Sequence, residues 1–490
     1  MRIVQTFYTN CFKEGDSCRG WLSEESNLMC WALSCLKAKQ FYDIVALYTD
    51  KHGEDILINQ LNLPYDEVHV ALDDASILKK LPNYLWAMPK IYTYSLQTEP
   101  FIHIDGDFIF WKRYEFNKPL IFQNIEYDVP LYKRIHKKLA ENIENTIFED
   151  CLKEEFTDGA FNMGLFGGYN IPFIREYASN ALSYVINNYE RNVFKEENNN
   201  INCFIEQFYI SYLVKKKQLD YEVIHGPVRN NSNKDYELAD FNYIHKTAGF
   251  SHFLGQSKSN HYVVDFIKQE LYSNYIGYYN HIHKIYSNGI KKKYYFSPQN
   301  TEININDLYC DLMDRLDGDH YTISEELKLN FRIYLEDKFS IYEGLRSSKP
   351  NNITMCNYLF SAKEIKESTK IKLNQNYIKI KKYMCPWSIM FMAQKFVPKE
   401  RVTVPNDFEI NEKYCIFAKT PFESSLVSIW VNEIVAFFVT RVLSNKYITV
   451  KEIWEQMNTL VIGESKLPFN SIILLLSTVH NYNIIDISYD

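Results

Sequence analysis

Two carboxylates lie one residue apart at the end of an apolar run that extends from Pro100 to Trp111. Burying two like charges among apolar side chains is costly unless a positive charge balances them. A divalent cation such as Mn²⁺ or Mg²⁺ can balance both, because it prefers oxygen ligands and shares its coordination shell with substrate phosphates. Asp105 and Asp107 are therefore candidate metal ligands, although an ordinary acidic turn after a strand has the same pattern.

Two further segments place polar groups among apolar ones. Asn162 interrupts an apolar run that ends in a glycine pair, and an amide there could orient a sugar hydroxyl by donating and accepting hydrogen bonds. His252, Gly255 and Lys258 follow one another farther along the chain. A histidine can ligate a metal, a glycine can admit a phosphate to the backbone, and a lysine can neutralise it. Taken singly, these segments also fit a plain strand with a glycine turn and a structural histidine.

Together these segments resemble the glycogenin-like and lipopolysaccharide-galactosyltransferase-like retaining glycosyltransferases, which have a GT-A fold. The shared order is a first strand, a lysine before the Asp-x-Asp pair, a Phe-Asn-x-Gly strand, an acid–glutamine pair on a helix and a His-Phe-x-Gly-x-x-Lys motif. The matching positions are Lys90, Asp105, Asp107, Asn162, Glu206, Gln207, His252, Gly255 and Lys258. The resemblance covers about residues 1–260. The chain departs from the family at Ser259 and Asn260, where Pro-Trp is usual, and at Glu206, where Asp is usual.

The resemblance implies a role for each of these residues. Asp105, Asp107 and His252 are expected to hold Mn²⁺ or Mg²⁺ on the donor diphosphate. The residues expected in the nucleotide-sugar site are Thr6, Phe7, Tyr8, Lys90, Asp105, Gly255 and Lys258. The residues expected to act in catalysis are Asp107, Asn162, Glu206 and Gln207. The donor implied by the resemblance is a UDP-sugar, and the implied transfer retains the anomeric configuration.

Apolar strands and helical patterns alternate along the first part of the chain, and this order predicts the sheet that must position the polar groups. The expected strands are 2–8, 43–48, 68–71 and 101–104, and the expected helices are 24–39, 54–61 and 85–96. Such alternation predicts an α/β fold with a Rossmann-like, mostly parallel sheet, in which ligands bind at the carboxyl ends of the strands. A charged helical insertion is expected at 127–157 and a loop at 187–202.

The length of 490 residues suggests two or three domains. We expect a GT-A domain at 1–270, a helical extension at 271–394 and a C-terminal α+β domain at 395–490. The last region is expected to hold strands at 401–404 and 414–417, helices at 427–443, 449–457 and 469–480, and a strand at 484–487, with Thr449 as a helix N-cap. This order suits a winged helix and weakly resembles PqqD-like elements, which bind a leader peptide as an added strand. A helical cap or a dimerisation domain is the alternative.

Composition narrows the set of partners. The formal net charge of −7 argues against a general affinity for nucleic acid. The ten cysteines include no Cys-x-x-Cys pair, which favours reduced thiols. The first residues show no secretory signal, and the apolar run 429–443 is too short and too polar to span a membrane. These features predict a cytoplasmic protein.

The sequence thus predicts a metal-dependent glycosyltransferase that moves a sugar from a nucleotide-sugar donor to a peptide or glycan acceptor. Two alternatives stay open. One is a catalytically inactive GT-A module that acts as a binding or scaffold protein. The other is a nucleotidyltransferase, which also uses paired aspartates, but usually has a Gly-rich loop with Lys or Arg after its first strand. Residues 15–20 match such a loop poorly.

Overall fold

The contacts in the computed structural model divide the chain into two compact units. The first comprises Met1–Lys258 and Asn274–Lys291, and the second comprises Ser259–Ser273 and Lys292–Asp490. The domain boundaries expected near residues 270 and 395 stay predictions. The structure describes residues 1–11, 18–127, 129–142, 149–154, 156, 159–197, 200–226, 228–229, 249–259, 261–289, 325–347, 365–386, 410–419, 422, 426–460, 467–481 and 484–488.

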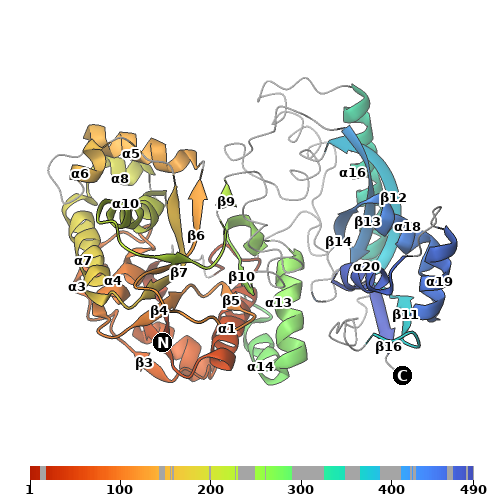
Figure 1. Ribbon diagram of the computed structural model, residues 1–490, viewed down its shortest axis with the longest axis horizontal. Coiled ribbons are helices and arrows are strands. Elements are labelled where there is room, and N and C mark those ends of the chain that lie inside the picture. The colour runs from red at the N-terminus through yellow and green to blue at the C-terminus, as the bar shows by residue number, and fades with distance from the viewer. Residues whose placement is uncertain are drawn as a thin grey trace. The chain divides into compact units, whose positions relative to one another are not determined.

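A mostly parallel sheet forms the centre of the first unit (Figure 1). Its strand order is β3-β2-β1-β4-β7-β6-β8, with β9 also paired to β6. Strand β7 runs antiparallel to β4 and β6, whereas the other pairs are parallel. The strands are β1 (Arg2–Phe7), β2 (Val45–Thr49), β3 (Glu67–His69), β4 (Phe101–Ile104), β6 (Ile121–Tyr127), β7 (Ala160–Gly168), β8 (Glu222–Val223) and β9 (Val228–Arg229). The prediction of a mostly parallel α/β sheet is confirmed.

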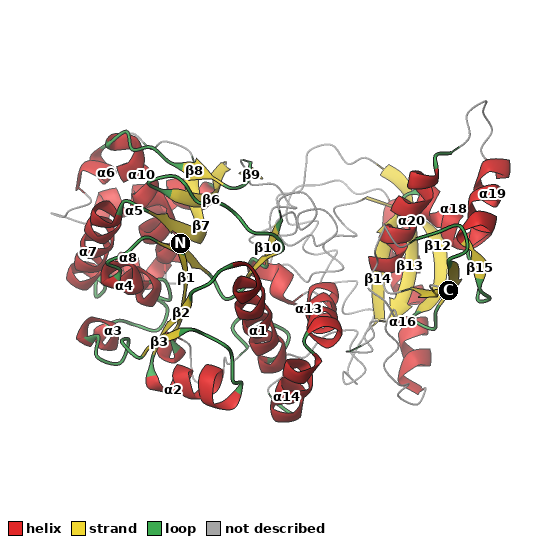
Figure 2. Cartoon of the chain, turned by 60° about the horizontal axis from the view of Figure 1, so that its bottom comes forward, coloured by secondary structure: helices red, strands yellow, loops and turns green. Residues whose placement is uncertain are grey.

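Helices lie on both faces of this sheet (Figures 1 and 2). They are α1 (Glu24–Phe41), α2 (Lys51–Glu54), η2 (Asp55–Gln60), α3 (Ser76–Lys80), α4 (Met88–Leu96), α5 (Pro130–Asn142), α6 (Glu149–Lys153), α7 (Ile171–Asn188), α8 (Asn192–Glu197), α9 (Asn200–Cys203), η3 (Phe204–Phe208), α10 (Tyr209–Lys216) and α14 (Ile276–Tyr286), with short 3-10 turns η1 (Thr9–Cys11) and η4 (Gly255–Ser259). A second small sheet pairs β5 (Phe108–Phe110) with β10 (Phe250–His252).

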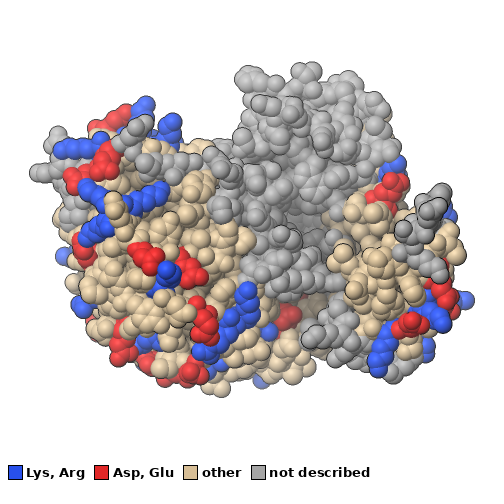
Figure 3. All heavy atoms as spheres, in the orientation of Figure 1, with Lys and Arg blue, Asp and Glu red and all other residues tan. Residues whose placement is uncertain are grey.

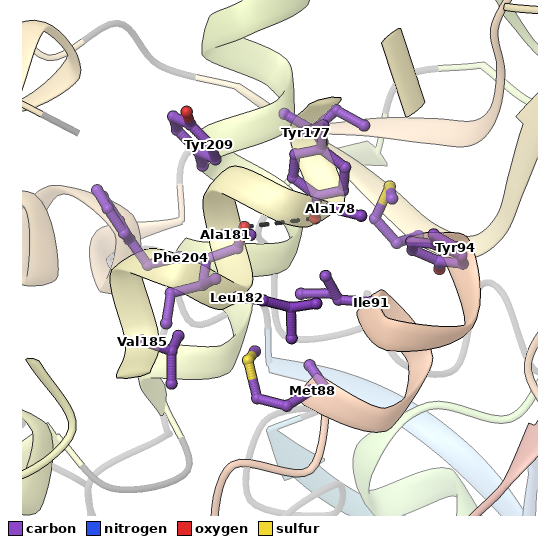
Figure 4. Packing of buried hydrophobic residues seen from close by; sticks show 14 of the residues in the cluster. Met88, Ile91, Tyr94, Tyr177, Ala178, Ala181, Leu182, Val185, Phe204 and Tyr209 are labelled. Atoms are coloured by element: carbon purple, nitrogen blue, oxygen red, sulfur yellow. Dashed lines mark hydrogen bonds between the residues drawn. The ribbon is translucent and has the colours of Figure 1, made fainter. Parts of the chain in front are cut away.

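Successive residues of the central strands point to opposite faces, and both faces are buried. Ile3 of β1 packs in the core cluster that contains Ala38 of α1, whereas Val4 packs in the cluster that contains α4 and α7. Figure 4 shows the latter cluster, where side chains of α4 lie against those of α7. Burial of both faces explains why the strands read as nearly continuous apolar runs in the sequence.

Local sequence explains where several helices begin. The Ser23 hydroxyl accepts a hydrogen bond from the Ser26 amide over 3.1 Å, and the Ser26 hydroxyl accepts one from the Ser23 amide over 2.9 Å, so α1 starts with a reciprocal cap.

The predicted loop at 187–202 is wrong, because α8 and α9 lie there. These short helices form because Phe194 and Ile201 bury their side chains in the core.

The second unit contains two three-stranded antiparallel sheets, β12-β13-β14 and β15-β11-β16. Its strands are β11 (Lys370–Leu373), β12 (Tyr377–Pro386), β13 (Ile410–Lys419), β14 (Leu426–Val431), β15 (Ile448–Thr449) and β16 (Ile485–Ser488). Its helices are α13 (His261–Asn274), whose last residue belongs to the first unit, α16 (Glu325–Ser347), α18 (Glu433–Phe437), η6 (Phe438–Val442), α19 (Val450–Leu460) and α20 (Phe469–Asn481).

Two expectations for this unit are tested directly. The helix predicted to begin at residue 427 begins only after Asn432, whose side chain accepts a hydrogen bond from the Val435 amide over 2.9 Å. The preceding residues, rich in β-branched side chains, form β14 instead. The predicted cap at Thr449 is confirmed, because its hydroxyl accepts from the Glu452 amide over 3.2 Å. The strand predicted at 401–404 lies outside the described residues, and the winged-helix assignment stays a prediction.

Surface and thiol features agree with the composition. Charges of both signs are interspersed on the face of the first unit seen in Figure 3. Among the described residues, no helix combines the length and apolar character of a membrane span. Cys18, Cys30, Cys35, Cys151 and Cys415 are buried free thiols, and Cys203 is a half-buried one. Burial raises the pKa of the Cys30 thiol well above its ordinary value, which keeps this thiol protonated and unreactive.

Candidate active site

The candidate metal ligands lie together at the end of β4. Asp105 and Asp107 follow this strand directly, and pairing of β10 with β5 places His252 opposite Phe108. One possible ligand atom from each of Asp105, Asp107 and His252 lies within 4.8 Å of the other two. Oxygen ligands about 2.1 Å from one Mg²⁺ lie about 3 Å apart when adjacent and about 4 Å apart when opposite. Small side-chain movements would therefore bring the three residues into one coordination shell, so they fit a divalent cation.

The sheet topology explains this location. Strand β1 has β2 and β3 on one side and β4 on the other, all parallel, so the strand order reverses between β1 and β4. Ligands of open α/β sheets bind at the carboxyl ends of the strands at such a reversal. Thr6, near the end of β1, lies there with its hydroxyl 3.0 Å from Nε2 of His103 on β4.

Asp107 lies between a lysine and a histidine. Its Oδ2 lies 2.5 Å from Nζ of Lys258, and its Oδ1 lies 3.4 Å from Nε2 of His252. Burial alone would raise the pKa of Asp107, but Lys258 and His252 outweigh burial and hold that pKa well below its ordinary value. Burial would likewise lower the pKa of Lys258, yet the neighbouring carboxylate raises it. Both groups are therefore charged at neutral pH, as a metal ligand and a phosphate-binding lysine must be.

Lys90 makes ion pairs with both Asp105 and Glu206. Its Nζ lies 2.7 Å from Oδ1 of Asp105 and 2.7 Å from Oε1 of Glu206, and it donates to the Met163 carbonyl over 2.7 Å. Burial raises the pKa of Glu206 to about 7, although Lys90 opposes the shift. Burial would lower the pKa of Lys90, but the two carboxylates raise it above its ordinary value. Neighbours of Lys90 on α4, including Ile91, pack in the core shown in Figure 4, which holds this lysine in place.

The Asn162 side chain makes hydrogen bonds within the sheet, to its own strand β7 and to the neighbouring strand β6. Its Oδ1 accepts a hydrogen bond from the Gly164 amide over 2.9 Å, and its Nδ2 donates to Glu126 over 2.8 Å. The Gly164 carbonyl in turn accepts from the Asp105 amide over 3.0 Å. Asn162 thus supports the backbone that positions Asp105. Gln207, on the same helix turn as Glu206, is half-buried and accepts a hydrogen bond from Tyr132. The catalytic roles of Asn162 and Gln207 stay predictions.

A cavity of about 320 Å³ opens over the carboxylates. The predicted site residues that line it are Thr6, Tyr8, Lys90, Asp105, Asp107 and Lys258. The lining residues that the sequence patterns did not single out for this site are Arg19, Trp21, Asn27, Trp31, Trp86 and Pro89, whereas Gly106, between the two aspartates, also lines it. Aromatic walls of this kind can stack against a base or a sugar ring. Trp21 and Trp86 lie in loops and Trp31 lies on α1, so their residue type was the signal available for them.

Two residues predicted for the nucleotide-sugar site, Phe7 and Gly255, are not among those that line the cavity. Phe7 packs edge-on against Trp31 with ring centroids 4.9 Å apart, and the Arg19 guanidinium lies 4.1 Å above the Phe7 ring. Phe7 therefore supports the lining. Gly255 has a φ of +48°, a conformation that favours glycine, and it starts the turn η4 that carries Lys258.

The fold and the site define an α/β protein with a candidate divalent-cation centre at the carboxyl edge of a mostly parallel sheet. Residues 1–285 match the model of a family of unknown function, DUF6734, and the chain belongs to that family. One solved structure similar to the chain is the apo form of mouse xyloside xylosyltransferase 1, at 8% identity and a TM-score of 0.25, covering 45% of this chain and 84% of that chain. No curated protein matches the sequence.

Proposed function

We propose that this chain is a metal-dependent glycosyltransferase of GT-A type that uses a nucleotide-sugar donor, a UDP-sugar, and retains the anomeric configuration. One observation carries the proposal. His252 and Lys258 converge on Asp105 and Asp107, which lie far from them in sequence; both aspartates and Lys258 line one cavity of the first unit, and His252 is buried against Asp107. Two acids and a lysine that line a cavity, with a histidine beside them, suit a diphosphate bound through a divalent cation.

The proposed roles follow from the contacts. Asp105, Asp107 and His252 would hold Mn²⁺ or Mg²⁺, which when bound supplies Lewis-acid stabilisation of the departing diphosphate. Lys258 would exchange its contact with Asp107 for one with a phosphate oxygen, where negative charge develops as the bond to the anomeric carbon breaks. The tryptophans of the cavity would stack on the donor and exclude water. A phosphate oxygen of the leaving group would take the acceptor proton, so no side chain is required as a base.

Lys90 and Glu206 would set the charge beneath the sugar. Lys90 contacts Asp105 and Glu206 at once, and its single positive charge offsets one of these two carboxylates. Because Lys90 and Glu206 are both buried and Asp105 is half-buried, the Lys90 Nζ is held between the two carboxylates. In this proposal Lys90 keeps Asp105 in its ligand orientation, and Glu206 faces the donor sugar.

The acceptor in this proposal is a peptide bound by the second unit. Strand β14 pairs with β13 and with no other strand in the part of the chain that the structure describes. An unpaired edge can bind an extended peptide as an added strand. Two apolar side chains of this unit, Ile434 and Leu474, are 61% and 68% exposed and could contribute apolar contacts. A glycan acceptor is the alternative outcome.

A panel of nucleotide sugars tests the donor. The full-length protein is incubated with each donor and Mn²⁺, and release of free nucleotide is measured with and without chelator. We expect metal-dependent release from one donor class and its loss in Asp107→Asn. Binding without turnover would support the inactive scaffold instead. Pyrophosphate release from a nucleoside triphosphate and a sugar phosphate would support a nucleotidyltransferase, and no nucleotide binding at all would overturn the proposal.

A further inference from the structure

Two buried polar atoms beside the candidate metal site have no hydrogen-bond partner. One is Nδ1 of His252, the ring nitrogen that faces away from Asp107, and the other is Oε1 of Gln123. His252 is 2% exposed and Gln123 is fully buried, so neither atom is satisfied by bulk solvent. Leaving a buried donor or acceptor unpaired costs about 1–3 kcal/mol. One is a possible donor and the other an acceptor, so the two groups are chemically complementary.

Both atoms lie over the same glycine. A Cβ built on Gly164 would lie 2.4 Å from Nδ1 of His252 and 2.5 Å from Oε1 of Gln123, which limits their separation to about 5 Å. No other residue type leaves this space open. Gln123 is further oriented by its own amide, because its Nε2 donates to Oδ1 of Asn124 over 3.0 Å and leaves Oε1 directed toward the glycine.

The sheet makes this approach possible through an irregularity. The register between β6 and β7 shifts between Phe122 and Asn124, so that Gln123 lies opposite residues 163–165 rather than in a regular pair. Such bulges redirect side chains and are frequent beside active sites. The same stretch of β7 provides the carbonyls that bind Lys90 and the Asp105 amide. Gln123 therefore lies beside the segment of β7 whose carbonyls position Lys90 and Asp105.

We infer that Gln123 is the positioning residue of the His252 metal ligand: its Oε1 accepts the Nδ1–H of His252, directly or through one water, so that the Nε2 lone pair faces the cation. The inference rests on the proposed function, which makes Nε2 a metal ligand. A histidine that ligates through one nitrogen carries its proton on the other, and an acceptor for that proton fixes the ring and its tautomer. Removing such a partner typically lowers metal affinity 10–100-fold.

The test measures Mn²⁺ binding by the full-length protein, without donor or acceptor, from the electron paramagnetic resonance signal of free Mn²⁺. Gln123→Met keeps the length of the side chain and removes the acceptor, so it should weaken Mn²⁺ binding about 10–100-fold. Gln123→Glu restores an acceptor and should recover the affinity. Gln97→Met is the matched control, because Gln97 is equally buried but donates to the Thr93 carbonyl at the end of α4. Its affinity should equal that of the wild type.

The outcomes separate this inference from the proposed function. If His252→Ala loses Mn²⁺ binding but Gln123→Met binds as the wild type does, the inference is overturned and the metal site stands. If the wild type does not bind Mn²⁺, or if His252→Ala binds equally well, both fall.

A second measurement needs no Gln123 variant, in case Gln123→Met does not fold. In wild-type protein with ¹⁵N-labelled histidine rings and bound Mg²⁺, the His252 ring, assigned by its loss in His252→Ala, should carry its proton on Nδ1 and exchange it slowly. A proton on Nε2, or fast exchange at Nδ1, overturns the inference.

Discussion

Replacing Glu206 by glutamine should change how the stability of the first unit depends on pH, and the structure sets the sign of the effect. Glu206 is buried, and burial raises its pKa from 4.5 to about 7 against the opposing charge of Lys90. Between these values the folded protein retains a proton that the unfolded chain has lost. The contribution of this carboxyl to the free energy of unfolding is thus fully present below pH 4.5 and is lost as the pH rises through 7.

The magnitude follows from the same two values. One unit of pKa difference corresponds to 1.36 kcal/mol at most, so the linkage relation gives a loss of about 2–3 kcal/mol between pH 5 and pH 8. Glutamine keeps the shape of the side chain and does not titrate in this range. The free energy of unfolding of Glu206→Gln, relative to that of the wild type, should therefore be about 2–3 kcal/mol higher at pH 8 than at pH 5.

The assay is urea unfolding of both proteins at a series of pH values, with hydrogen exchange of β1, β4 and β7 reporting on the first unit alone. Glu197 is a matched control of opposite sign. It is buried, but Lys138 and Arg134 outweigh burial and lower its pKa. The stability it contributes is present above pH 4.5 and is lost only as the pH falls below that value, so Glu197→Gln should be destabilised by a constant amount between pH 5 and pH 8.

A pH-independent difference between wild type and Glu206→Gln would refute this reasoning. It would mean that Lys90 keeps Glu206 ionised over the whole range. A difference that grows in favour of the wild type as the pH rises would show that the ion pair outweighs burial entirely.

Three further predictions concern the cation site and the second unit. Asp107→Ala should still fold but should lower turnover of the accepted donor about 100-fold or more, since loss of a metal anchor removes about 3 kcal/mol or more of barrier stabilisation; near-normal turnover at saturating Mn²⁺ would contradict the mechanism. Gly106→Ala should weaken Mn²⁺ binding and cost about 1–3 kcal/mol of stability, because its Cβ would lie 2.2 Å from Cε2 of Trp31; calorimetric and thermal values equal to wild type would show that the indole moves freely. Leu474→Glu in the full-length chain, or deletion of residues 395–490, should weaken peptide modification at least tenfold more than donor hydrolysis; equal loss of both activities would instead make this region a structural cap.

Contiguous residues were enough to predict much of the first unit. The apolar run before Asp105 predicts β4 with its observed bounds, and the alternation of strands and helices predicts the mostly parallel sheet. Local chemistry also predicts the cap at Thr449. These features depend on the period of apolar residues and on hydrogen bonds between near neighbours, which can be read from adjacent positions. The error at residues 427–431 has the same origin, because a short apolar run fits a strand or a helix equally well by periodicity.

The sequence by itself determined which residue types were available to a metal and a phosphate: the paired aspartates, His252 and Lys258. Only the tertiary structure decided their contacts. The ion pairs of Lys90 with Asp105 and Glu206 join a helix, a strand end and a second helix. The approach of Gln123 to His252 is likewise absent from any local pattern, because it depends on the register of β7 and on the space left by one glycine. Register and close approach are set by packing on both faces of the sheet at once, and that packing involves residues more than a hundred positions apart.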